Sequence, residues 1–245
     1  MADTQGATLL EANLQTIRVM IETKLDMQMI GKIVRQERFA LPYSESDIAK
    51  ALMIGYNAEV NQRGCKIQND NIGTKEIAET IAKWMIDPKE KPGLLLYGTV
   101  GTGKTTMLKA VCRVINSCLE AENDRDRLGT CGKEVISMIR AKDVLDAYQT
   151  NNEFYKKMMS VKFIAIDEIG VESIDVKSYG NVSEPLIDLL STRYDKQKMT
   201  LVSSNLDLKQ VSERYGLRLA DRFNEMFKKI AFVGASYRGY ANQKK

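Results

Sequence analysis

The feature that most constrains the fold of this chain is a glycine-rich segment between an apolar run and a helical pattern. Residues 98–105 match the pattern G-x-x-x-x-G-K-[ST], which ends here in Lys104 and Thr105. The run Gly93–Tyr97 before the segment predicts a short strand, and a helix is predicted after it, from about Lys104 to Leu119. A turn that fits the pattern by chance would rarely stand between a strand and a helix. The context therefore predicts a phosphate-binding loop in an α/β fold.

The residue types in this loop suit the binding of a nucleotide phosphate. Glycines allow the backbone to turn tightly and to come close to an anion, and free N–H groups at a helix N-terminus point toward it. Lys104 is expected to reach the β- and γ-phosphates of ATP, and the Thr105 hydroxyl is expected to bind Mg²⁺. The loop residues expected to contact the nucleotide are Gly98, Thr99, Val100, Gly101, Thr102, Gly103, Lys104, Thr105 and Thr106.

Two adjacent carboxylates stand at the end of another apolar run. Residues 163–168 read Phe-Ile-Ala-Ile-Asp-Glu, so Asp167 and Glu168 follow a predicted strand. Two such acids can also cap a helix or lie in a solvated turn, but their place 63 residues after Lys104, at the end of an apolar strand, favours a functional role. We expect Asp167 to contact the nucleotide and, with Thr105, to hold Mg²⁺. Glu168 is expected to act as the general base on the attacking water.

From Thr74 onward, apolar runs alternate with helical patterns. Strands are predicted at 93–97, 135–139, 161–166, 199–203 and 230–233. Helices are predicted at 74–87, 104–119, 141–150 and 185–196, followed by two short helices divided at Gly216. Strands that are apolar throughout and alternate with helices predict a parallel five-stranded sheet with helices on both faces. The expected fold class is therefore an α/β P-loop NTPase core.

The first part of the chain has no recognisable chemistry. We predict a helix over 1–36, from apolar residues spaced by three and four, and a second helix capped by Ser46 or Asp47. The polar stretch 61–73, which contains two glycines, is the predicted linker. The predicted domains are a small helical N-terminal region that binds a partner, 1–72, and an ATPase domain, 73–245. Structural packing is an equally good account of the N-terminal region.

Composition excludes several kinds of site. The chain has no histidine, so its mechanism cannot use a histidine base. Its four cysteines form no C-x-x-C pair, which argues against zinc and favours free thiols in a reducing cytoplasm. No apolar run reaches the roughly 18 residues that a membrane span needs, so no membrane association is expected. Solvated lysines explain the net charge of +4 at least as well as a nucleic-acid surface does.

Two further features could complete a nucleotide site. Asn205 follows the fourth predicted strand, where it could orient the attacking water or simply cap a turn. Arg218 and Arg222 are four residues apart on one predicted helix. They could pair on the surface with Asp221 or Glu225, or reach the γ-phosphate of a neighbouring subunit. The spacing alone leaves this choice open.

In this order the motifs resemble those of the AAA+ ATPases, and in particular the DnaC-type helicase loaders and the IstB-type ATPases of transposition. The matching stretches are Leu95–Thr105, Ile166–Val171, Ser203–Leu206, Tyr215–Arg222 and Ser236–Arg238. The resemblance covers about residues 74–240. It implies that Asn205 is the sensor-1 residue and that Arg222 is the arginine finger, with Arg218 as its helper. Only 12 residues follow Val233, too few for the helical lid of most AAA+ proteins, and loader-type proteins likewise end shortly after this strand.

The resemblance implies an ATP-dependent helicase loader in DNA replication that forms a homo-oligomer when it binds ATP. Its expected partners are a replicative DNA helicase and single-stranded DNA, and its expected location is the cytoplasm. Two other functions stay open: an IstB-type accessory ATPase that acts with a transposase, and an adaptor that switches with ATP but hydrolyses little of it. A small-molecule phosphotransferase is a further rival, against which Glu168 and the missing lid argue.

Three segments are candidate DNA contacts. Aromatic and basic residues occur together at 154–157 and in the tail 237–245, although a solvated face explains each of them as well. Family members also have a helical element near the second strand that grips DNA. Residues 120–133 lie in about that place, where a plain loop is an equally good prediction.

Overall fold

The computed structural model describes residues 38–64, 73–121, 136–178, 181–234 and 236–237. Packing assigns Phe39–Lys245 to one compact unit. The predicted helix over 1–36, and all but the first two residues of the segment 120–133, lie outside the described residues. Among the helices in the described ranges, none is both long and apolar enough to cross a membrane.

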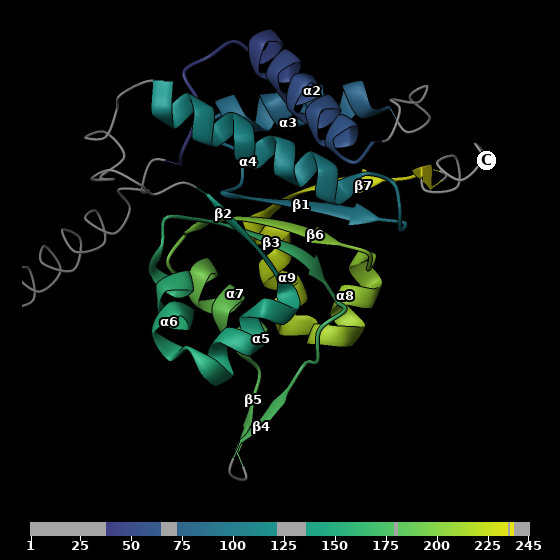
Figure 1. Ribbon diagram of the computed structural model, residues 1–245. Coiled ribbons are helices and arrows are strands. Elements are labelled where there is room, and N and C mark those ends of the chain that lie inside the picture. The colour runs from purple at the N-terminus through teal and green to yellow at the C-terminus, as the bar shows by residue number, and fades with distance from the viewer. Residues whose placement is uncertain (1–37, 65–72, 122–135, 179–180, 235, 238–245) are drawn as a thin grey trace, which may run out of the picture. The chain divides into compact units, whose positions relative to one another are not determined.

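A parallel sheet forms the centre of the compact unit (Figure 1). Its strands are β1 (Gly93–Gly98), β2 (Ser137–Arg140), β3 (Phe163–Ile169), β6 (Met199–Ser204) and β7 (Phe227–Phe232). They lie in the order β2-β3-β6-β1-β7, and each neighbouring pair is parallel. The predicted α/β class with a five-stranded parallel sheet is thus confirmed. The carboxyl ends of parallel strands meet at one edge, so the residues that follow β1, β3 and β6 come together there.

Helices cover both faces of this sheet (Figure 1). One face is covered by α2 (Glu45–Gln62), α3 (Thr74–Ile86) and α4 (Lys104–Ala121). The other is covered by α5 (Ala141–Thr150), α6 (Asn152–Ser160), α7 (Pro185–Asp195), α8 (Leu208–Tyr215) and α9 (Leu217–Met226). Strand β6, in the middle, is buried at every position. Burial on both faces explains why β1 and the first part of β3 are continuous apolar runs that do not alternate with polar residues.

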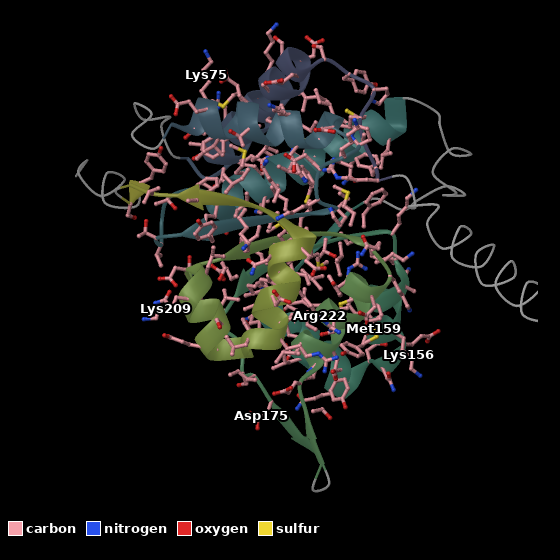
Figure 2. All side chains as sticks on the ribbon, turned by 180° about the vertical axis from the view of Figure 1, so that it is seen from behind. Lys75, Lys156, Met159, Asp175, Lys209 and Arg222 are labelled. Atoms are coloured by element: carbon pink, nitrogen blue, oxygen red, sulfur yellow. The ribbon has the colours of Figure 1, made fainter. Side chains whose placement is uncertain are left out.

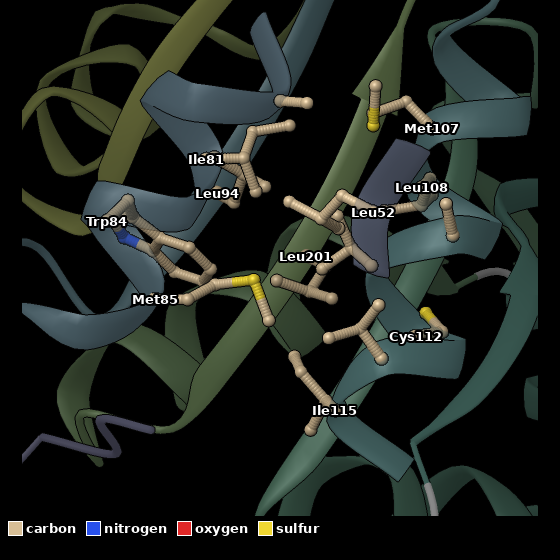
Figure 3. Packing of buried hydrophobic residues seen from close by; sticks show 14 of the residues in the cluster. Leu52, Ile81, Trp84, Met85, Leu94, Met107, Leu108, Cys112, Ile115 and Leu201 are labelled. Carbon is tan, nitrogen blue, oxygen red and sulfur yellow. The ribbon is translucent and has the colours of Figure 1, made fainter. Parts of the chain in front are cut away.

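Figure 3 shows the core that α2, α3 and α4 form with the sheet. Leu52 of α2, Trp84 of α3 and Leu108 of α4 are fully buried in one cluster with Leu94 of β1. Full burial of each such side chain contributes roughly 1.5–3 kcal/mol. Helix α2 is therefore part of the core of the sheet, and the domain boundary predicted at residue 72 falls inside the compact unit because the apolar face of α2 packs on α3 and α4.

The start of α2 differs from the sequence prediction by a few residues. The helix begins at Glu45, because the Ser44 hydroxyl caps it by accepting a hydrogen bond from the Asp47 amide at 3.1 Å. The sequence had favoured Ser46 or Asp47 as the cap. All three are polar residues of the type that caps helices, so the choice among them depends on the path of the preceding chain.

Two described elements have no counterpart in the sequence prediction. Helix α6 is short and buries only Tyr155 and Met158, so its helical pattern is weak. A hairpin of β4 (Val176–Ser178) and β5 (Asn181–Ser183) lies between β3 and α7 in the chain and projects from the body of the unit (Figure 1). Its strands are too short to give a periodic signal.

Candidate nucleotide-binding site

The predicted phosphate loop joins the carboxyl end of β1 to α4 in the middle of the sheet. Gly98 has φ of +131°, and a Cβ atom at this position would collide with the Phe232 carbonyl oxygen of β7. Gly103 has φ of +93°, and a Cβ atom there would lie 2.5 Å from the Tyr56 hydroxyl of α2. Only glycine fits these two positions. The loop is therefore enclosed by β7 on one side and by α2 on another.

The Lys104 side chain lies within the loop and is only 6% exposed. Its Nζ donates hydrogen bonds to the carbonyl oxygens of Gly98, at 2.9 Å, and Thr99, at 2.6 Å. The buried Thr102 hydroxyl also donates to the Thr99 carbonyl, at 2.8 Å, which ties the loop to itself. The oxygens of a phosphate would be charged and therefore stronger acceptors for the ammonium than these carbonyls. Lys104 is therefore placed where it could bind an anion that enters the loop.

Thr105 and Asp167, the two residues predicted to hold a metal, are in direct contact. The Thr105 hydroxyl donates to Asp167 Oδ1 at 3.0 Å, and the Ser203 hydroxyl of β6 donates to the same oxygen. Mg²⁺ prefers hydroxyl and carboxylate oxygens and completes its shell with water and phosphate. Among the described residues, no group of three or more His, Cys, Asp or Glu side chains could hold a metal. Thr105 and Asp167 nevertheless offer the hydroxyl and carboxylate oxygens that Mg²⁺ binds.

Glu168, the predicted general base, stands in an unusual backbone conformation directly after Asp167. Its φ is +59°, and the register between β3 and β6 shifts here, between Ile166 and Ile169. The Glu168 amide donates to the Ser203 hydroxyl at 2.9 Å. One hydroxyl thus orients the Asp167 carboxylate and holds the Glu168 turn. Sequence reasoning missed Ser203 as a site residue, although a hydroxyl side chain near the carboxyl end of a predicted strand was a signal that could have found it.

Asn205 lies at the same edge of the sheet. It follows Ser204, the last residue of β6, which pairs with Tyr97 of β1 on one side and Ile169 of β3 on the other. The position of Asn205 is therefore between the phosphate loop and the Glu168 turn, and its side chain is half-buried. This is the place that the sequence assigned to a residue that orients the attacking water.

A comparison with protein families identifies this arrangement. The model of the bacterial DnaA ATPase domain matches residues 67–228 of the chain. The chain belongs to this family. It is therefore an AAA+ ATPase that binds ATP, as its phosphate loop predicts, and its family is one of DNA replication proteins.

Solved structures are similar to this DnaA-family ATPase in fold at low sequence identity. The crystal structure of the DnaC helicase loader has 19% identity, covers 67% of this chain and 97% of its own, and gives a TM-score of 0.48. The crystal structure of DnaI has 18% identity, covers 68% of this chain and 87% of its own, and gives a TM-score of 0.46. Domain III of the Thermotoga maritima replication initiation protein DnaA has 21% identity, covers 67% of this chain and 63% of its own, and gives a TM-score of 0.41. No curated protein matches the chain significantly.

The two arginines of α9 differ in their surroundings in this DnaA-family ATPase. The Arg222 guanidinium lies 3.6 Å from Asp195 of α7 and over the Tyr194 ring, 5.1 Å from its centroid. Figure 2 marks the position of Arg222. Its side chain is only 18% exposed. Arg218, in the first turn of α9, is exposed. The structure thus gives Arg222 a partner within the chain. This partner is Asp195, because α9 packs on α7; the spacing in the sequence had suggested Asp221 or Glu225.

Arg140 is a second residue that the sequence did not single out. It ends β2 and pairs in register with Asp167 of β3. Its guanidinium donates to Asp143 at 3.0 Å, and this hydrogen bond lowers the pKa of the Asp143 carboxyl. The same bond raises the pKa of Arg140, and the charge of Glu168 adds to this increase. A permanent cation therefore stands on the β2 side of the acidic turn.

Proposed function

We propose that this AAA+ ATPase is a helicase loader of DNA replication, which uses the binding and hydrolysis of ATP·Mg²⁺ to control its grip on a replicative helicase and on single-stranded DNA. One observation supports the catalytic part above all. Thr105 of the phosphate loop and Asp167 of β3 share a hydrogen bond, and Glu168 follows immediately. Membership of the DnaA family and the Asp-Glu-Ile-Gly and Ser-Tyr-Arg sequences support the role in replication.

The described residues suggest how the site would work. On binding ATP, Lys104 would exchange the carbonyl oxygens of the loop for phosphate oxygens. Thr105 and Asp167 would hold Mg²⁺, which neutralises charge on the phosphates when it is bound. Glu168 would accept a proton from the attacking water, and Asn205 would orient that water. Lys104 and Thr105 begin α4, which the phosphate loop joins to the carboxyl end of β1, whereas Asp167, Glu168 and Asn205 lie at, or directly after, the carboxyl ends of β3 and β6.

An arginine from a neighbouring subunit would complete the site. Sequence resemblance assigned this role to Arg222, with Arg218 as helper. Because Arg222 is paired with Asp195 and Arg218 is exposed, the contacts favour Arg218 as the residue that reaches across. Chains with Arg218→Ala should lose most turnover and regain it when they are mixed with Lys104→Ala chains, which bind no ATP but present the arginine. If Arg222→Ala shows the larger loss and the rescue, the original assignment to Arg222 holds.

The surface of α6 is the best supported DNA contact among the described candidates. Phe154 is 43% exposed, and Lys156 and Lys157 on the same helix are also exposed. Figure 2 marks the position of Lys156. An aromatic face with neighbouring cations suits the stacking of single-stranded bases. We expect Phe154→Ala to weaken the binding of single-stranded DNA about 5- to 100-fold, as the loss of one stacked base would. Fluorescence anisotropy with a labelled oligonucleotide measures this, and an unchanged affinity would remove α6 from the proposal.

Co-purification tests the proposed partner most directly. The full chain is used as bait, since α2 belongs to the core of the sheet and a fragment ending at residue 72 would divide it. The host replicative helicase should be retained by the wild-type chain with ATP and lost with the Lys104→Ala chain. Retention of a transposase and no helicase would establish the IstB-type alternative. ATP turnover that is unchanged in Glu168→Gln would support the adaptor that hardly hydrolyses.

A further inference from the structure

A buried carboxylate outside the nucleotide site lies in the turn after β3. The Glu172 side chain is completely buried, and it accepts hydrogen bonds from two separate parts of the chain. The Gly170 amide donates to its Oε2 at 2.8 Å. The Tyr215 hydroxyl donates to its Oε1, and Arg214 Nη2 lies 3.7 Å from the same oxygen. Arg214 also donates to the Glu172 backbone carbonyl.

These contacts join two functional segments. Gly170 is two residues after Glu168, at the end of the acidic turn. Arg214 and Tyr215 end α8, and Gly216, with φ of +84°, is both the C-cap of α8 and the N-cap of α9. Arg218 stands in the first turn of α9, so only Gly216 and Leu217 separate it from Tyr215. One carboxylate therefore ties the turn that bears Glu168 to the helix end that presents Arg218.

Physical considerations indicate that this tie is stiff. A buried carboxylate that lost its donors would be strongly unfavourable, so neither segment can move away without the other or without a replacement partner. Gly170 is also in close contact with the next element: a Cβ atom there would lie 2.6 Å from Leu206 Cδ1. Burial and the hydrogen bond to Glu172 both raise the pKa of the Tyr215 hydroxyl, which therefore remains a donor throughout the physiological range.

We propose that Glu172 is a positioning residue that couples the Glu168 turn to Arg218, so that the state of one chain's site sets how its arginine is presented to the neighbouring subunit. The proposal rests on the proposed role of Arg218 in a shared site. Glu172 touches neither the nucleotide nor its phosphates in this account; it acts through Tyr215 and Arg214 on α8 and through Gly170 on the turn.

The chain offers a matched control for this test. Glu59 is a second buried carboxylate, 5% exposed, whose partners are Arg113 at 2.6 Å and Lys109 at 3.6 Å. It joins α2 to α4 on the opposite face of the sheet. Glu59→Gln and Glu172→Gln each neutralise a buried carboxylate that is paired with a cation. A general loss of stability should therefore appear in both variants, and a specific effect on the arginine only in Glu172→Gln.

The first experiment uses mixed chains. Arg218→Ala chains, which hydrolyse slowly, are mixed with Lys104→Ala chains, which supply the arginine. The Lys104→Ala chain is then given either Glu172→Gln or Glu59→Gln. We expect the Glu172→Gln donor to restore at least tenfold less turnover than the plain donor, and the Glu59→Gln donor to restore turnover within twofold. Equal rescue by all three donors would overturn the proposal. If the plain donor restores nothing, it is the shared site of the proposed function that has failed.

The second experiment does not depend on rescue. Hydrogen–deuterium exchange of residues 208–218 is measured in single chains with and without ATP·Mg²⁺. The coupling predicts a change on binding in the wild type and in Glu59→Gln, and at least a fivefold smaller change in Glu172→Gln. A full change in Glu172→Gln would refute the coupling even if subunits share no site. If Glu172→Gln does not fold, Tyr215→Phe removes a single donor and should reduce turnover with the KM for ATP within twofold.

Discussion

Replacing Ser203 by alanine probes the geometry of the acidic turn with a change of one atom. The hydroxyl of the buried Ser203 donates a hydrogen bond to the Asp167 carboxylate and accepts one from the Glu168 amide. Alanine leaves the strand intact and removes both bonds. We expect Ser203→Ala to lower the turnover of ATP by about 10- to 100-fold, with a smaller effect on the binding of ATP itself.

The magnitude follows from the two bonds. A hydrogen bond to a charged group is worth about 1.5–3 kcal/mol, and one between neutral groups about 0.5–1.5 kcal/mol. Glu168 has φ of +59°, a conformation that costs a non-glycine residue about 1–3 kcal/mol and that needs support from its surroundings. If about 1.4–2.8 kcal/mol of this support is lost in the transition state, the rate falls by the factor given above.

Ser204→Ala is the matched control for this assay. Ser204 is equally buried in the same strand, and its hydroxyl donates to the Ile169 carbonyl at 2.9 Å and accepts the Leu206 amide at 3.0 Å. Both variants lose two hydrogen bonds and should unfold at similarly lowered temperatures. Single-turnover hydrolysis at saturating ATP then separates them. The reasoning is refuted if folded Ser203→Ala turns over ATP within twofold of Ser204→Ala.

Two further predictions concern buried groups of the core. Arg193 is fully buried, and its guanidinium donates to Thr200 and to backbone carbonyls that include those of Met158 and Met199. Burial lowers its pKa to about 9, which still leaves it charged at neutral pH. Arg193→Met should therefore lower the free energy of unfolding in urea by roughly 3 kcal/mol or more, while the exposed Lys196→Met should change it by less than about 0.5 kcal/mol. Burial, followed by the charge of Asp167, raises the pKa of the Cys112 thiol from 9.0 to about 12. Folding therefore favours the protonated thiol, and the free energy of unfolding should fall as the pH rises from about 9 toward 12. In a variant with Cys112 as its single cysteine, labelling at pH 8 should be at least tenfold slower in the folded than in the unfolded chain, and equal rates would contradict this.

The sequence could predict the centre of the site because parallel strands bring their ends to one edge. A continuous apolar run predicts a strand buried on both faces, and this pattern located the strands that lead to Gly98 and Asp167. The strand that leads to Asn205 is mixed, because Thr200, Ser203 and Ser204 are polar. The contact between Thr105 and Asp167 follows from that topology. A lysine and a threonine directly after a glycine-rich turn have few roles other than binding phosphate and Mg²⁺, so these residue types indicated the chemistry of the site.

Other features depend on packing that no local pattern expresses. The choice of Asp195 as partner for Arg222 requires the packing of α9 on α7. The inclusion of α2 in the core requires its apolar face to pack on α4, next to the loop at Gly103. The role of Ser203 depends on the register between β3 and β6, which sets one hydroxyl against the acidic turn. In each case the partner is distant in the chain, and periodicity gives no information about it.

The central claim is that the phosphate loop and the end of β3 bind one ATP and its magnesium together. Calorimetric titration with ATP, in the presence of Mg²⁺ or of EDTA, measures this directly in the wild type, Asp167→Asn and Lys104→Ala. We predict that Mg²⁺ tightens binding at least tenfold in the wild type, that Asp167→Asn loses most of this gain, and that Lys104→Ala binds no ATP under either condition. A magnesium-dependent gain that survives intact in Asp167→Asn would contradict the account.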